Sequence, residues 1–174
     1  MIKLGLILVS LLSLWWHGYQ FSTGDQSIYV PQALKLIDDR LYQRDYFVNH
    51  RPESRFSLFF PLMAGIVRLT HWDIQWLYFS LYLLVHLLIT WTVYSLSLTL
   101  TGSRFIALIA SLLLSLPKFV GGTTITTLDV SWLPRFAVLP LFLFSLQQLA
   151  LGKTKLMLLS CFIVGLFHPF SGLL

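Results

Sequence analysis

The residues best suited to chemistry lie in the longest polar segment of the chain, residues 21–55. This segment holds five of the seven acidic residues and follows directly on the first apolar run. Asp25 stands a few residues beyond that run, which places its carboxylate at the surface of a membrane if the run spans one. A carboxylate there can accept a proton from a hydroxyl group or polarise it during group transfer. Asp25 is therefore the predicted catalytic residue.

Four basic side chains are candidates for binding an anionic substrate at the same surface. Guanidinium groups hold phosphate oxygens through paired hydrogen bonds, and a helix N-terminus adds backbone N–H donors. The predicted substrate-binding residues are Arg51 and Arg55 at the end of the polar segment, Arg135 at the start of a later apolar run, and His168 before Pro169.

Asp129 is the predicted metal ligand. It closes a loop rich in Gly and Thr, residues 121–129, and under the favoured topology this loop lies on the same side as Asp25. Two carboxylates that meet there can share a divalent cation such as Mg²⁺, which prefers oxygen ligands. The sequence thus indicates a divalent metal ion as the candidate cofactor.

Each of these residues also has a purely structural interpretation. Asp25 can cap the helix that follows it, and Asp129 can serve as a loop residue or helix cap. Arg135 can reach lipid head groups from the end of a span, and His168-Pro169 can mark a kink. Asp38 and Asp39, together with Arg40 and Arg44, favour a solvated helix face with i,i+4 ion pairs.

The composition requires a bilayer around most of the chain. Hydrophobic residues make up 56% and charged residues 11% of the 174 residues, and the mean hydropathy is +0.76. The twelve Lys and Arg are dispersed and form no clustered basic face, so nucleic acid is excluded as a partner. The single cysteine, Cys161, rules out a disulfide framework within the chain.

The apolar runs predict an all-α fold, a polytopic membrane helical bundle with juxtamembrane amphipathic helices in the first outer loop. We expect one transmembrane domain over 1–174, and the end of the sequence inside an apolar run suggests the N-terminal part of a larger domain. The predicted spans are 3–21, 73–99, 103–118, 133–151 and 156–174, and the predicted surface helices are 27–46 and 56–69.

The topology separates the charges if 56–69 does not cross the membrane. The inner loops then carry Lys3, Arg104, Lys153 and Lys155 and no acidic residue, while all seven acidic residues lie outside. The outer loops also hold eight Lys and Arg, so charge alone leaves the orientation undecided.

A series of residues along the chain resembles a known family. The series comprises Gly24-Asp25-Gln26, Tyr29, Tyr46, Arg51-Pro52 and Phe59-Phe60-Pro61-Leu62, followed later by Leu133-Pro134-Arg135 and Phe167-His168-Pro169. It is similar to the start of the GT-C superfamily, multi-pass glycosyltransferases that use polyprenyl-phosphate sugars, and to uncharacterised bacterial relatives of that group. The resemblance covers residues 23–62 and 129–169.

This resemblance implies a transferase that moves a hexose from a polyprenyl-phosphate sugar, with membrane lipids as partners. It also implies a multi-pass location in a bacterial inner membrane. Gln26 departs from the family pattern, because many relatives carry a second carboxylate at that position. The departure leaves a non-catalytic membrane scaffold open as a second function. A third is a transporter component in which Asp25, His86 and His168 line a path.

Overall fold

The computed structural model describes residues 2–50, 53–116 and 128–172, and all regular structure among these residues is helical. The helices follow in the order α1 (Ile2–His17), α2 (Gln26–Ile37), α3 (Tyr46–His50), α4 (Glu53–Phe56), α5 (Phe59–Thr70), α6 (Ile74–Thr101), α7 (Arg104–Leu114), α8 (Pro134–Ala150), α9 (Thr154–Phe167) and α10 (Pro169–Gly172).

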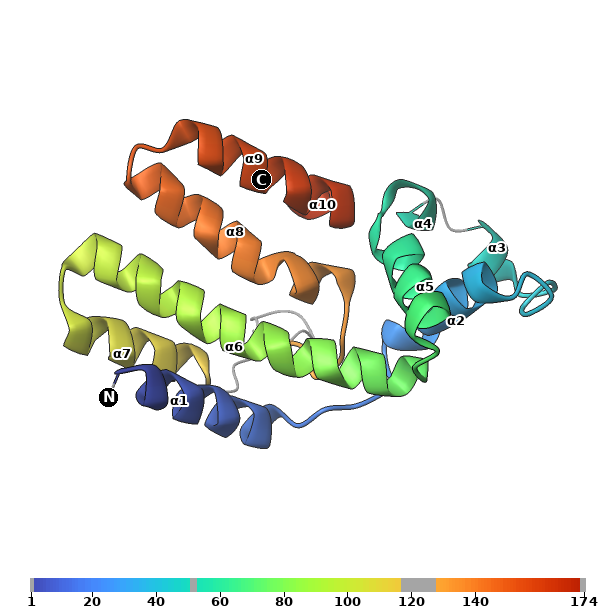
Figure 1. Cartoon of the computed structure of the whole chain (residues 1–174), viewed down its shortest axis with the longest axis horizontal. Coiled ribbons are helices and arrows are strands. Elements are labelled where there is room, and N and C mark those ends of the chain that lie inside the picture. The colour runs from blue at the N-terminus through green and yellow to red at the C-terminus, as the bar shows by residue number, and fades with distance from the viewer. Residues whose placement is uncertain (1, 51–52, 117–127, 173–174) are drawn as a thin grey trace.

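Helices α1, α6, α7, α8 and α9 lie along the long axis of the molecule and alternate in direction (Figure 1). α6 contacts α1, α7 and α8, and α9 packs against α8. The N-terminus, the α6–α7 turn and the α8–α9 turn lie together at one end, which we call the basic end. Its basic residues are Lys3, Arg104, Lys153 and Lys155.

The short helices α2 to α5 gather at the opposite end, which we call the surface-helix end (Figure 1). α2 packs against α5, and Arg68 of α5 donates hydrogen bonds to the carbonyl oxygens of Leu36 and Ile37, the last residues of α2. These carbonyls have no partner within their own helix. The arginine therefore joins the two helices and terminates α2.

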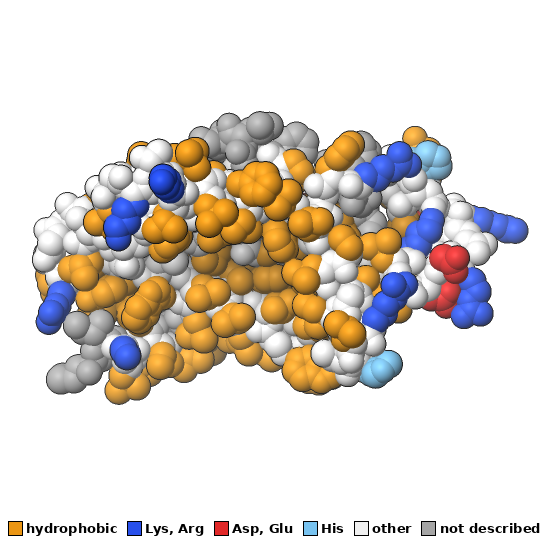
Figure 2. All heavy atoms as spheres, turned by 45° about the horizontal axis from the view of Figure 1, so that its top comes forward, with side chains coloured by type: hydrophobic (Ala, Val, Ile, Leu, Met, Phe, Trp, Pro, Cys, Tyr) orange, Lys and Arg blue, Asp and Glu red, His pale blue; other side chains and the backbone are white. Residues whose placement is uncertain are grey.

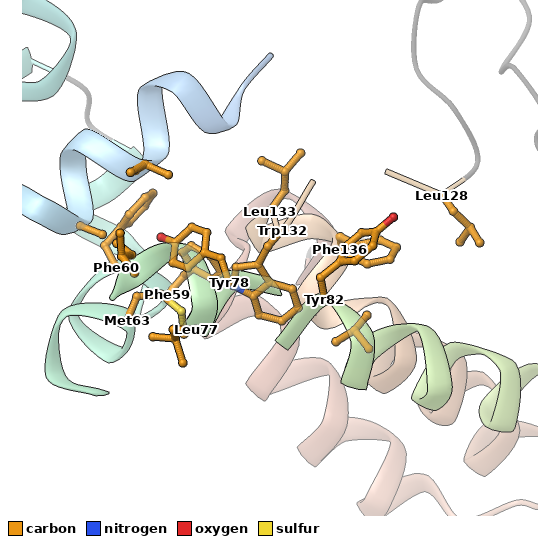
Figure 3. Close-up of a cluster of buried hydrophobic side chains, with 14 of the residues drawn as sticks. Phe59, Phe60, Met63, Leu77, Tyr78, Tyr82, Leu128, Trp132, Leu133 and Phe136 are labelled. Atoms are coloured by element: carbon orange, nitrogen blue, oxygen red, sulfur yellow. The ribbon is translucent and has the colours of Figure 1, made fainter. Parts of the chain in front are cut away.

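The main core lies where α2, α5, α6 and the start of α8 meet (Figure 3). Phe59 of α5 lies between two large rings, with centroids 6.3 Å from Tyr78 and 6.0 Å from Trp132. Tyr82 packs against Phe136 at 5.4 Å. The segment before α8 is thus part of the core, which fixes the position of α8 against α6.

Only α6, among the helices of the described residues, is long and apolar enough to cross a membrane by length and composition. It has 28 residues, a length of about 42 Å at 1.5 Å per residue. Asp73 caps its start by accepting a hydrogen bond from the N–H of Gln75 at 2.8 Å, and Gly102 ends it with a φ of 67°. The other apolar helices are shorter.

The predicted helices are confirmed in part. α6 coincides with the expected helix 73–99 and α8 with 133–151, while the helix expected over 56–69 begins later, at Phe59. The expectation that 3–21 is one helix is wrong at its end, because α1 stops at His17 and Gly18 adopts a φ of 71°.

Two further boundaries need correction. The surface helix predicted over 27–46 ends at Ile37, and a chain of turns leads to α3. Asp38 accepts hydrogen bonds from the backbone and side chain of Arg40, which favour a turn over a helix and hold the pKa of Asp38 below its usual value. Asp38 and Arg40 thus pair two residues apart on a turn, and the expected i,i+4 pairing of Asp38 on a helix face is wrong.

The run predicted over 156–174 is broken rather than continuous. α9 ends at Phe167 and α10 starts at Pro169, because the proline ring has no N–H to continue the helix. The interpretation of His168-Pro169 as a break is confirmed. In the predicted span 103–118, α7 ends at Leu114, and residues 117–118 lie outside the described residues.

The core predicts a strong dependence on Phe59, whose side chain is fully buried (0% exposed). Phe59→Ala removes contacts with Tyr78 and Trp132 and should lower the free energy of unfolding by about 3–5 kcal/mol. The measurement is unfolding of the detergent-solubilised protein followed by tryptophan fluorescence. Phe56→Ala, at a side chain that is 72% exposed, is the matched control and should change stability little. Equal effects at both positions would contradict this account of the core.

Candidate functional site

Arg135 joins two aspartates from distant parts of the chain. Its Nη1 donates a hydrogen bond to Asp25 Oδ2 at 2.9 Å, while Nη2 and Nε donate to the two carboxylate oxygens of Asp129 at 2.9 and 3.0 Å. Asp129 is six residues before the arginine, whereas Asp25 is 110 residues before it. We call these three residues the Asp–Arg–Asp cluster.

The start of α8 positions Arg135 and Asp129. Pro134 occupies the first turn of the helix, and Leu133 before it is extended, with φ −128° and ψ 155°. Trp132 and Leu133 are buried in the main core. The backbone before the arginine is therefore held by packing. The short connection back to Asp129 allows the bidentate ion pair between Arg135 and Asp129.

A network of hydrogen bonds brings the linker after α1 beside the segment before α8. The N–H of Gln20 donates to the carbonyl of Val130 at 2.8 Å. The hydroxyl of Tyr82, on α6, lies 2.7 Å from the carbonyl oxygen of Gly18 and 3.1 Å from that of Asp129 and is shared between them. Tyr82 thus contacts both the linker after α1, which leads to Asp25, and the segment before α8, which carries Asp129.

Gln26 secures the residue next to Asp25. It is fully buried, its side-chain amide nitrogen donates to the carbonyl of Trp132 at 3.2 Å, and its side-chain oxygen accepts a hydrogen bond from the N–H of Ser22. An amide can donate and accept at once, whereas a carboxylate in this place can only accept. Gln26 is therefore a structural residue of the site.

Asp25 does not cap α2, which corrects the capping interpretation. Its backbone is already helical, with φ −60° and ψ −26°, and its side chain makes no capping hydrogen bond. The hydroxyl of Ser27 donates to the carbonyl of Gly24 instead of capping the helix. The carboxylate of Asp25 is consequently directed to Arg135.

The cluster combines a carboxylate and a guanidinium that both remain accessible. The side chains of Asp25 and Arg135 are 48% and 35% exposed, and that of Asp129 is 16% exposed. Arg135 commits three of its five N–H groups to the aspartates, and the described residues supply no partner for the other two. Among the described residues, none hydrogen-bonds to Asp25 Oδ1. One carboxylate oxygen and two N–H donors are thus available to a substrate.

The described residues do not fit the divalent metal site predicted at Asp129. Arg135 engages both oxygens of Asp129 and one oxygen of Asp25, so the guanidinium occupies the position between the carboxylates. In the described part of the chain, no group of three or more His, Cys, Asp or Glu side chains is placed to hold a metal ion. The positive charge that joins the two aspartates is the arginine itself.

The other predicted substrate-binding residues lie elsewhere. Arg51 is outside the described residues, and Arg55 is exposed on α4. His168 lies between α9 and α10, where its Nδ1 is 2.6 Å from the hydroxyl oxygen of Ser171. The three hydrogen bonds of the Asp–Arg–Asp cluster involve neither Arg55 nor His168. The structure thus brings together Asp25, Asp129 and Arg135 from the predicted set.

Sequence reasoning missed Tyr82 as a residue of the site. It lies within the apolar helix α6 and belongs to none of the polar segments that supply the other candidates. A buried tyrosine hydroxyl usually needs a hydrogen-bond partner, and that need was the signal that Tyr82 meets backbone from another segment.

Comparison with known proteins found no family model, no curated protein and no solved structure that matches the chain.

The role of Gln26 gives a test of the site's architecture. Gln26→Glu keeps the shape of the side chain but places a buried carboxylate against the carbonyl of Trp132, so the free energy of unfolding should fall by about 1–3 kcal/mol or more. Thermal unfolding of the purified protein measures this. Gln43→Glu, at an exposed turn position, is the control and should be nearly neutral. A stable Gln26→Glu protein would show that the amide does not secure the site.

Proposed function

We propose that the chain is a membrane protein that transfers a hexose from a polyprenyl-phosphate donor, with the Asp–Arg–Asp cluster as its reaction site. The observation that carries the proposal is the meeting of Asp25, Arg135 and Asp129 at the surface-helix end of an apolar bundle. A lipid phosphate has a charged head and an apolar tail, so its site needs charged side chains next to an apolar surface.

The distribution of side chains supports a membrane location. Figure 2 shows Lys and Arg at both ends of the molecule and mainly hydrophobic side chains between them on this face. Exposed large apolar residues occur on each of the shorter bundle helices α1, α7 and α9, for example Leu8, Leu113 and Phe162. Such a continuous apolar surface is unfavourable in water and favourable in lipid.

The surface-helix end supplies the features of a lipid–water boundary. α5 is apolar on the side that carries Phe59, Phe60 and Met63, which pack in the core, and Arg68 lies on its last turn. Trp72 and Trp76 are exposed where α6 begins, and tryptophan is enriched at membrane interfaces. A phosphate bound at Arg135 would lie at this level, with the polyprenyl chain in the bilayer.

The reaction that fits the cluster is a displacement at the anomeric carbon of the sugar. The acceptor hydroxyl gives its proton to the free oxygen of Asp25, and its oxygen forms the new bond to the anomeric carbon. The bond between that carbon and the phosphate oxygen breaks, and the lipid phosphate leaves with the electron pair. The two uncommitted N–H groups of Arg135 stabilise the leaving phosphate, and Asp129 holds the guanidinium in place.

The second candidate is a non-catalytic membrane scaffold in which the cluster only joins two loops. The observation in its favour is that Gln26 stands beside Asp25 and is committed to hydrogen bonds with Ser22 and Trp132. Under this alternative Arg135 is a structural cross-link, and loss of the Asp25 charge has no catalytic consequence.

The catalytic test is Asp25→Asn. Asparagine keeps the size of the side chain and an oxygen that accepts from Arg135, but it cannot take the proton, so transfer should fall by roughly a hundredfold or more. The measurement is release of polyprenyl phosphate from polyprenyl-phosphate mannose and glucose in proteoliposomes. Membrane insertion and thermal stability should change little.

Asp38→Asn is the matched control for this experiment. Asp38 pairs with the exposed Arg40 on a turn outside the cluster, so its replacement should leave the rate unchanged. If Asp25→Asn is as silent as Asp38→Asn, Asp25 is not the base and the scaffold becomes the better assignment.

The topology is tested with single cysteines in a Cys161→Ser background. Cysteines at Ser27 and His71 should react with an impermeant thiol reagent from one side of the membrane, because both positions are exposed at the surface-helix end. A cysteine at Thr154, at the start of α9, should react only from the other side. Labelling of Ser27 and His71 from opposite sides would mean that α5 crosses the membrane, which contradicts the proposed site.

A further inference from the structure

A groove between α1 and α6 near the basic end has the features of a binding site for a single lipid. It has a volume of about 340 Å³ and is lined mainly by Lys3, Leu6, Ile7, Leu87, Leu88 and Trp91. The groove is open on one side, and its only charged lining residue is Lys3. It lies apart from the Asp–Arg–Asp cluster, toward the opposite end of the bundle.

The position of the groove along α6 fits the level of lipid head groups. A span needs about 20 residues, and counting from Ile74 at the surface-helix end brings the opposite boundary close to Trp91. Beyond that point α6 carries hydroxyl side chains at every second position, at Ser95, Ser97, Thr99 and Thr101. Lys3 and Trp91 therefore lie where lysine and tryptophan meet head groups, while the leucines lie deeper.

The charge at this level favours an anion. Lys3 is exposed, and in the described part of the chain no acidic residue forms a salt bridge with it. Arg104 starts α7 and contributes a second positive charge at the same end, where α7 contacts α1. Uncompensated lysine and arginine side chains at a membrane surface attract anionic lipids.

We propose that this groove binds one anionic phospholipid, with its phosphate against the ammonium group of Lys3 and one acyl chain along Leu6, Ile7 and Leu87. The inference rests on the membrane location in the proposed function and does not depend on the transferase activity. An acyl chain fits the lining because the groove offers apolar side chains below a single cation. A zwitterionic lipid should bind less tightly, because Lys3 repels the positive charge of its head group.

The experiment measures lipid retained by the purified chain in native mass spectrometry, with equal amounts of phosphatidylglycerol and phosphatidylcholine of the same acyl chains. Phosphatidylglycerol should be retained preferentially, and Lys3→Gln should reduce that preference by about fivefold. Lys155→Gln removes a charge at the same end but outside the groove, so it is the control and should have little effect. Equal retention of both lipids by the unaltered chain would overturn the proposal.

A steric pair tests the groove itself. Leu87→Trp fills the groove and should abolish preferential retention, whereas Leu159→Trp, at an exposed leucine of α9, should not. Dimers that disappear with Leu87→Trp would instead assign the groove to a second copy of the chain. If phosphatidylglycerol is retained but Asp25→Asn has no effect on transfer, only the proposed transferase function is refuted. If the unaltered chain shows no lipid preference but full transfer activity, only the lipid site is refuted.

Discussion

The candidate site depends on how the segment before α8 is held between two other parts of the chain. Trp132 and Leu133 are packed against α5 and α6, and the carbonyl of Trp132 accepts the amide of Gln26. Because this segment carries Asp129 at one side and Arg135 at the other, its placement brings the guanidinium to Asp25. Tyr82 strengthens the same arrangement from α6 by bonding backbone carbonyls on both segments.

This arrangement explains why one arginine can hold two carboxylates at a partly exposed position. Exposed ion pairs usually contribute little to stability, because water competes and the side chains lose freedom. Here the backbone on each side is fixed by buried residues, so less side-chain freedom is lost when the pair forms. Within the described residues, two N–H groups of Arg135 and one carboxylate oxygen of Asp25 have no partner, which is what the proposed substrate site requires.

The bundle separates two kinds of chemistry by distance. The surface-helix end carries the carboxylates along with lysine and arginine, whereas the charged residues of the basic end are Lys3, Arg104, Lys153 and Lys155, and about 42 Å of α6 joins the two ends. The apolar surface between the ends supports the proposed membrane location, and it would keep a donor site on one face from a head-group site on the other.

The sequence by itself determined the features that depend on local pattern. Long apolar runs predicted α6 and α8, a shorter apolar run predicted a helix at α5, and the polar segments identified Asp25, Asp129 and Arg135 as candidates. Hydrophobicity and turn chemistry act over a few residues, so they can be read without the fold. The capping of the last carbonyls of α2, however, comes from Arg68, which lies 31 residues beyond Ile37.

Only the tertiary structure decided which candidates meet and which groups they contact. The pairing of Asp25 with Arg135 spans 110 residues, and the bond from Gln26 to Trp132 spans 106, so neither leaves a signal in local spacing. The same polar residues would equally suit a helix cap, a metal ligand or a head-group contact. Packing of Trp132 and Leu133 selected one of these outcomes, because it fixed where the arginine could reach.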